Sequence, residues 1–172
     1  PSDLGWMPYV KSWAQDLPDK VPEAARAHVV SLFDKCFQEG LNFQRKHLRE
    51  PVGCVDVQLA TSCAVIFQTL FAGSESSVDF EAYKKAPDLL LRLVEKLWFF
   101  AFNWAIGGSV TAEGHEKFDE FTRGLVESAG INLTLPPTGS TYDYFVEIND
   151  SGGKFAPWKS VVPTFTFDSD QP

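Results

Sequence analysis

Residues 89–106 read LLLRLVEKLWFFAFNWAI and predict one long, strongly apolar helix that ends at Gly107-Gly108. Its apolar residues recur at intervals of three and four, the period of one helix face. Trp98, Phe99 and Phe102 make much of the opposite side apolar as well, so this helix must be covered on several sides. We therefore expect the central rod of a helical domain, with one face formed by Leu89, Leu90, Leu93, Leu97, Phe100 and Trp104.

A membrane-spanning helix is the alternative interpretation of the same run, since about 20 apolar residues cross a bilayer. Arg92, Glu95 and Lys96, however, place three charges within five positions. The sequence therefore predicts the core helix of a soluble domain and no membrane partner.

The bulk composition fits a packed domain. The 172 residues suit one domain, or one domain with an extension, and 14% aromatic residues argue against disorder. A net charge of −8 argues against a nucleic-acid partner, because phosphate binding needs a basic surface. Cys36, Cys54 and Cys63 are irregularly spaced, which suits buried thiols in a reducing compartment better than a disulfide framework. The chain begins at Pro1 without Met or a signal peptide, so we expect a processed protein or a piece of a longer chain.

Helical periodicity predicts further helices on both sides of the central rod. Gly40 lies inside one of them and indicates a close helix contact or a kink, since glycine there costs up to about 1 kcal/mol relative to alanine. Gly130 fits the position just after the last helix. The expected helices span residues 4–17, 23–49, 56–71, 79–85, 87–106 and 111–128. The first is capped by Ser2 or Asp3 and has Pro8 in its first turn, the second is ended by Pro51-Val52-Gly53, and the last is capped by Thr111.

The sequence changes character after residue 130. Turn-forming residues at 135–139 are followed by alternation from Tyr142 to Ile148, the period of a strand. Residues 149–153 read NDSGG and predict a hairpin turn that returns through Lys154-Phe155, and residues 161–167 are again expected to be extended. We therefore predict a mainly α fold, with five to six helices over residues 1–130 and a small β-hairpin extension over residues 131–172.

Patterns of common catalytic and metal sites are missing from the sequence. It contains neither a GxxxxGK[ST] phosphate loop nor a GxGxxG motif after a strand. His28 and His47, expected on helix surfaces, and His115 lack zinc-ligand spacing. Cys36 and Cys63 lie on apolar helix faces, which favours buried packing over nucleophilic catalysis. We therefore predict no catalytic residue and no metal site.

Several residues have a plain structural interpretation beside a functional one. Asp119-Glu120 is interpreted as exposed helix surface rather than as an acid pair. Arg123 is a salt-bridge partner or a sensor of phosphate charge, and Gly107-Gly108 is a helix stop or bare backbone that approaches a ligand such as a nucleotide. Asn132-Leu133-Thr134 matches a glycosylation acceptor, which matters only in the secretory pathway. The tryptophans expected to anchor the core are Trp6, Trp13, Trp98 and Trp104.

Four stretches together resemble axonemal dynein heavy chains. They are LGWMPYVKSW at residues 4–13, FFAFNWAIGG at 99–108, FDEFTR at 118–123 and STYDYFVEINDSGGKFAPWKSVVPTF at 140–165. The resemblance covers essentially the whole chain. It is to the small helical lid of the second AAA+ module of the motor ring, together with the extension that leads toward the third module.

This resemblance implies a non-catalytic lid that packs between AAA+ modules and transmits nucleotide-dependent movement as a rigid-body shift. The parent chain would be an ATPase and the microtubule minus-end motor of cilia and flagella, in the cytoplasm and the axonemal cytoskeleton. Its partners would be microtubules and dynein intermediate and light chains. The phosphate loop, the Mg²⁺-binding acids and the arginine finger would belong to the large part of the module, so ATP or ADP with Mg²⁺ is expected only in the parent ring.

AAA+ lids often border the adenine and sometimes supply an arginine toward the γ-phosphate. The resemblance therefore makes Trp104, Gly107 and Gly108 candidates to face the nucleotide in the intact ring, and Arg123 a candidate for the sensing arginine.

Two other functions stay open from the residues alone. A free-standing acidic helical adaptor or scaffold predicts a stable monomer with one groove for a partner helix. A lid separated from its ring predicts instead apolar surface on two opposite faces. A small metal or cofactor enzyme would require His28, His115 and a cysteine to converge in space.

Overall fold

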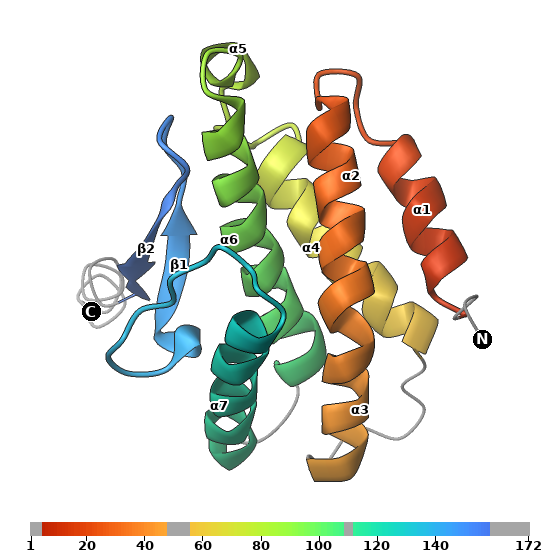
Figure 1. Cartoon of the computed structure of the whole chain (residues 1–172), viewed down its shortest axis with the longest axis vertical. Coiled ribbons are helices and arrows are strands. Elements are labelled where there is room, and N and C mark those ends of the chain that lie inside the picture. The colour runs from red at the N-terminus through yellow and green to blue at the C-terminus, as the bar shows by residue number, and fades with distance from the viewer. Residues whose placement is uncertain (1–4, 48–55, 109–111, 159–172) are drawn as a thin grey trace, which may run out of the picture.

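The computed structural model describes residues 5–47, 56–108 and 112–158. These residues form a helical bundle with a small antiparallel hairpin on one side, which confirms the predicted mainly α fold (Figure 1). The helices are α1 (Met7–Gln15), α2 (Glu23–Leu32), α3 (Gln38–His47), α4 (Asp56–Ala72), α5 (Phe80–Tyr83), α6 (Pro87–Gly107) and α7 (Ala112–Ser128), and the strands are β1 (Tyr144–Glu147) and β2 (Lys154–Pro157).

α6 is the central helix, as the apolar run predicts. Pro87 stands in its first turn, where a proline removes no helical hydrogen bond. α6 packs most extensively on α4 and α2, and α7 and the hairpin lie against other sides of it (Figure 1). Glu95 and Asn103, which interrupt the apolar pattern, are only 2% and 4% exposed. These two polar side chains therefore lie inside the protein and need partners there.

α2 and α3 form one long rod, joined by a π-helical turn, η1 (Phe33–Phe37; Figure 1). This confirms the helix predicted from residue 23 as far as His47, while the π turn itself was not predicted. The turn places Phe33, Cys36 and Phe37 all in the core. Farther along, a Cβ atom on Gly40 would lie 2.7 Å from the Phe102 ring, which confirms the predicted close contact with the central helix.

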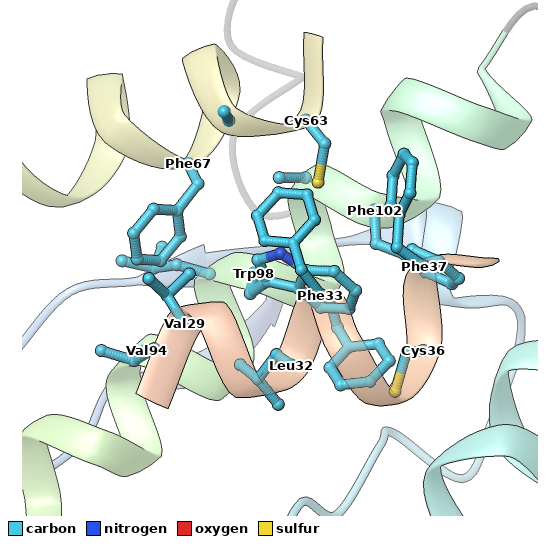
Figure 2. Packing of buried hydrophobic residues seen from close by; sticks show 14 of the residues in the cluster. Val29, Leu32, Phe33, Cys36, Phe37, Cys63, Phe67, Val94, Trp98 and Phe102 are labelled. Carbon is cyan, nitrogen blue, oxygen red and sulfur yellow. The ribbon is translucent and has the colours of Figure 1, made fainter. Parts of the chain in front are cut away.

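Aromatic rings fill the core between α2, α4 and α6 (Figure 2). The Phe33 ring centroid lies 5.2 Å from that of Trp98 and 5.3 Å from that of Phe37. Cys36 and Cys63 are buried free thiols beside these rings. Burial raises the pKa of Cys36 to about 12 and also raises the pKa of Cys63, so both thiols are protonated packing groups, as predicted.

α7 ends in the left-handed glycine that the sequence predicts. Gly130 has a φ of +69°, and its N–H donates to the Glu127 carbonyl at 3.2 Å. The N–H of Ile131 donates to the Val126 carbonyl at 3.1 Å. Together these bonds make a Schellman motif, which ends the helix and redirects the chain toward the bundle.

The hairpin is shorter than predicted. β1 pairs antiparallel with β2, with Phe145 opposite Ala156. Tyr142 and Asp143, expected at the start of the strand, instead lie in a 3₁₀ turn, η2 (Thr141–Asp143). The Ser140 side chain accepts a bond from the Tyr142 N–H at 3.0 Å, and the Asp143 carboxylate accepts one from the Ser140 N–H at 2.9 Å. This capping box favours a helical turn, and it overrides the alternating pattern of the sequence.

Several predicted features lie outside the described residues: the caps at Ser2, Asp3 and Thr111, the turn Pro51-Val52-Gly53, Cys54, and the extended segment 161–167. Within the described ranges, no helix combines the length and apolar character that crossing a bilayer requires.

Candidate functional site

The predicted site residues lie where the C-terminal half of α6 meets α7 and the η2 turn. We call this region the junction and define it by Asn103, Trp104, Gly107, His115, Asp119, Thr122, Arg123, Thr141 and Tyr142. α6 supplies the first three of these residues, α7 the next four and η2 the last two.

Tyr142 is the centre of the junction. Its hydroxyl donates to the Asn103 carbonyl at 3.0 Å, and a Cβ atom on Gly107 would overlap that hydroxyl. Gly107 is therefore bare backbone where a phenol ring packs against the helix end. Burial raises the pKa of Tyr142, and the nearby negative charge of Asp119 raises it further. The phenol is thus held in its neutral, hydrogen-bonding form.

Two rings enclose Tyr142. His115 stacks on it, with centroids 4.1 Å apart and an interplanar angle of 13°. Trp104 meets it edge-on, with centroids 5.1 Å apart and an angle of 85°. Trp104 is half-buried, so it closes the junction while keeping part of its ring at the surface. The prediction that Trp104 helps to anchor the core is thus confirmed at the edge of the core.

Asp119 connects α7 to the η2 turn. One carboxylate oxygen accepts from the Thr141 N–H at 2.7 Å, and the other accepts from Arg123 Nε at 3.0 Å. Arg123 also donates to the Gly139 carbonyl at 3.3 Å. The salt-bridge interpretation of Arg123 is confirmed, whereas the interpretation of Asp119 as exposed surface is wrong, because the residue is only 8% exposed. Its neighbour Glu120 is exposed, as expected.

Asn103 completes the network from the side of α6. Its amide nitrogen donates to Thr141 Oγ1 at 2.8 Å, and its amide oxygen accepts from Thr122 Oγ1 at 3.3 Å. Asn103 is therefore paired with both threonine side chains in the interior, which lowers the cost of burying these polar groups.

Comparison with known protein families identifies one that matches most of the chain. The sequence model of the dynein heavy chain AAA lid domain matches residues 29–160, from within α2 to just past β2.

The chain belongs to the dynein heavy chain AAA lid family.

Individual relatives of this dynein lid are axonemal heavy chains. It is 26% identical to human dynein axonemal heavy chain 6 and 27% identical to the ciliary dynein beta chain of Heliocidaris crassispina, in both cases over all of this chain and 4% of the relative. It is 28% identical to human dynein axonemal heavy chain 1 over 86% of this chain and 3% of the relative. The chain thus spans a few per cent of the length of these relatives. No solved structure matches it.

The structure of the dynein lid brings some predicted site residues together and separates others. Trp104 and Gly107 both contact Tyr142, and Arg123 reaches the same network through Asp119. Gly108 lies just past the helix end, where a Cβ atom would collide with the Trp104 carbonyl. Gly107-Gly108 is thus a helix stop, but Gly108 has a helical φ of −67° and not a left-handed one. That these four residues face a nucleotide stays a prediction.

Two surface grooves of the dynein lid border the junction, since each is lined by one junction residue, Tyr142 or Arg123. One groove of about 490 Å³ is lined by Thr138, Gly139, Tyr142, Asp143, Tyr144, Pro157 and Trp158. A second, of about 470 Å³, is lined by Arg123 and by residues at and after the end of α7. The polar contacts of the junction join the η2 turn to α6 and α7, and so hold the segment before the hairpin on the helices.

Histidines of the lid lie in separate surroundings. His28 contacts the buried carboxylate of Glu95 at 2.8 Å, and Arg92 contacts the same carboxylate at 2.9 Å. His28 thus faces the central helix and is half-buried, unlike the exposed His47. In the part of the chain that the structure describes, no three His, Cys, Asp or Glu side chains are grouped to hold a metal ion.

Sequence reasoning missed the roles of Asp119, Tyr142 and Asn103. The spacing of Asp119 and Arg123 at i, i+4 was an available signal for an ion pair. Asn103, an uncharged polar residue in an apolar helix, was an available signal for a buried hydrogen-bond partner. No local pattern showed that Tyr142 would pack on Gly107, since 35 residues separate them.

Proposed function

We propose that this chain is the lid of the second AAA+ module of an axonemal dynein heavy chain, together with the extension toward the third module. In this role it packs between modules and transmits their nucleotide-dependent movement. The parent chain is then an ATP-driven microtubule motor of cilia and flagella. The family match and the whole-chain similarity to axonemal heavy chains support this proposal.

The surface of α4 is the observation that carries the packing role. No charged residue occurs from Val57 to Ala72, although 22% of the chain is charged. Val57 and Val65 are 41% and 52% exposed on this helix. Apolar side chains exposed on an uncharged helix face favour contact with a partner, because charged residues are depleted at the centre of interfaces.

A second apolar surface supports a position between two neighbours. Trp158, just after β2, is 37% exposed and lies against Phe145 of β1 and Phe100 of α6. The hairpin lies on one side of α6, and α4 packs on another side of the same helix (Figure 1). Two separated apolar surfaces match the expectation for a lid separated from its ring better than the single groove expected of an adaptor.

The nucleotide of the proposed ring is ATP or ADP with Mg²⁺, held by other parts of the heavy chain. Trp104, Gly107, Gly108 and Arg123 are the proposed nucleotide-facing residues of the lid. The half-buried states of Trp104 and Arg123 support this assignment, because part of each side chain stays accessible to a neighbour. The proposed partners of the motor are microtubules and dynein intermediate and light chains.

The test uses the intact heavy chain with the substitution Val65→Glu. A carboxylate on the proposed α4 interface would lose its water on contact with a neighbouring module. We expect microtubule-stimulated ATPase activity and gliding velocity to fall at least several-fold. Asn132→Glu is the matched control, because it adds the same charge in an exposed loop.

The 172-residue chain carrying Val65→Glu should keep the circular dichroism and unfolding midpoint of the unchanged chain, which shows that the lid itself still folds. Unchanged motor activity in the Val65→Glu heavy chain would overturn the proposed packing role.

A further inference from the structure

The β1–β2 hairpin is fastened to the helices at its turn. The Tyr83 hydroxyl donates to the Asn149 carbonyl at 2.5 Å and accepts from the Gly152 N–H at 2.9 Å. The Lys96 ammonium donates to the Gly152 carbonyl at 2.9 Å. We call Tyr83, Lys96, Asn149 and Gly152 the tip latch. Its helix-side members come from α5 and α6, and they bind only backbone atoms of the turn.

The turn is shaped to lie flat on α6. Gly152 has a φ of +94° and Gly153 a φ of +73°, backbone conformations that favour glycine. A Cβ atom on Gly153 would lie 2.7 Å from Leu93 Cδ1, and one on Gly152 would lie 3.3 Å from the Leu89 carbonyl oxygen. The two glycines therefore allow the hairpin turn to approach the helix closely enough for the tip latch to form.

The other end of the hairpin is fastened through the junction. There the Tyr142 hydroxyl binds the Asn103 carbonyl, and Thr141 binds both Asn103 and Asp119. Lys96 and Asn103 are seven residues apart on α6, which corresponds to about 10 Å along the helix axis. Two attachments at this separation oppose sliding along α6 and pivoting about either attachment, because either motion would break buried hydrogen bonds at one end or the other.

We propose that α6 and the hairpin form one rigid lever, held by the tip latch and the junction. Any displacement of α6 then moves the hairpin by the same rotation. As a mechanical element of the motor this lever rests on the proposed function, since it is what would carry the lid's movement toward the next module. As a physical coupling it concerns this chain alone.

The test is a set of residual dipolar couplings of backbone amides, measured by NMR on the 172-residue chain. These couplings report the orientations of N–H bonds in a common frame. We expect the amides of α6 and of the hairpin to fit a single alignment tensor. A separate hairpin tensor of smaller magnitude in the unchanged chain would overturn the proposal, and this result needs no variant.

The double variant Tyr83→Phe/Lys96→Met removes the three tip-latch bonds while keeping the size of both side chains. We expect the hairpin tensor to fall in magnitude relative to that of α6, and the Gly152 amide to exchange with solvent about five-fold faster or more, the factor for one lost hydrogen bond. Glu81→Gln/Lys84→Met is the control, because it removes an exposed ion pair next to Tyr83 and leaves the three tip-latch bonds in place.

A tip-latch variant that keeps a single tensor and unchanged exchange would also overturn the proposal. Neither measurement involves nucleotide, neighbouring modules or microtubules, so failure of the lever and failure of the proposed motor role are distinguishable.

Discussion

The aromatic core and the junction hold the same central helix in two different ways. In the core, the Phe33 ring packs against the rings of Phe37 and Trp98. In the junction, Asn103 and Asp119 hold the chain through directed hydrogen bonds. Apolar packing is additive over many small contacts, whereas each buried hydrogen bond requires a particular partner. Substitutions in the core should therefore destabilise the protein according to the side-chain volume that they remove. Substitutions in the junction should destabilise it according to the hydrogen-bonding groups that they remove.

The largest expected effect belongs to the core. Phe33→Ala should lower the free energy of unfolding by about 3–5 kcal/mol, because it removes a fully buried ring that packs against Trp13 of α1 and Trp98 of α6. Urea denaturation followed by circular dichroism measures this loss. Val65→Ala, at a 52% exposed position, should change it by no more than about 0.5 kcal/mol. Equal effects of the two substitutions would show that the aromatic cluster is not the main apolar core.

Next comes the carboxylate of the junction. Asp119→Ala should cost roughly 2–3 kcal/mol, because the Thr141 N–H and the Arg123 guanidinium both lose a charged partner. Glu120→Ala, one residue farther on the exposed side of α7, should stay within about 0.5 kcal/mol. The same denaturation experiment applies. A cost for Glu120→Ala as large as that for Asp119→Ala would contradict the assignment of Asp119 as the buried connector.

Two glycine substitutions should have opposite signs. Gly107→Ala should destabilise the protein by about 1–3 kcal/mol, because the new methyl group would collide with the Tyr142 hydroxyl. Gly124→Ala in α7 should stabilise it by up to about 1 kcal/mol, because its Cβ would meet no atom and alanine favours the helix. Thermal unfolding of the two variants gives the comparison directly. Stabilisation by both would mean that the end of α6 is not packed against Tyr142.

The smallest expected effect concerns the Tyr142 hydroxyl. Tyr142→Phe should cost about 1 kcal/mol at neutral pH, because it removes one buried hydrogen bond. The folded state also raises the pKa of Tyr142, mainly through burial, so the unfolded chain releases this proton first as the pH rises.

Because the pKa of Tyr142 is higher in the folded than in the unfolded state, its contribution to stability is fully present below about pH 10, the usual tyrosine pKa. The contribution declines above that pH. Between pH 8 and pH 10.5, the free energy of unfolding should therefore fall more for the unchanged chain than for Tyr142→Phe. Parallel declines would show that Tyr142 is not titrated differently in the folded state.

Much of the core was predictable from the sequence, and little of the junction was. The period of residues 89–106 predicts a helix covered on several sides, and the structure confirms it. Gly40 was predictable because a close helix contact leaves no room for a side chain, and Gly130 because a left-handed helix end favours glycine. Asp119 was misjudged because charged residues on an amphipathic helix are usually exposed, and its partner Thr141 lies 22 residues away.

The predicted start of the first strand was wrong for a local reason and not for a long-range one. Tyr142 and Tyr144 are two positions apart and fit the alternating pattern of a strand, but the capping box of Ser140 and Asp143 holds Tyr142 in a turn. Without that turn the Tyr142 ring would not be directed onto Gly107. Alternating apolar residues thus identified the hairpin but not where it begins.

The π turn at Phe33–Phe37 has a consequence for sequence length. A π turn contains an additional residue compared with a regular α-helix that spans the same distance. Each residue of a regular helix rotates the chain by about 100°, but the π turn accommodates its additional residue without this rotation. Deleting one residue here would therefore restore a regular helix with the same faces inward. Homologues with a regular helix at this point should therefore be one residue shorter between Val29 and Gly40, and an alignment gap there would reflect helix geometry and not the loss of a core contact.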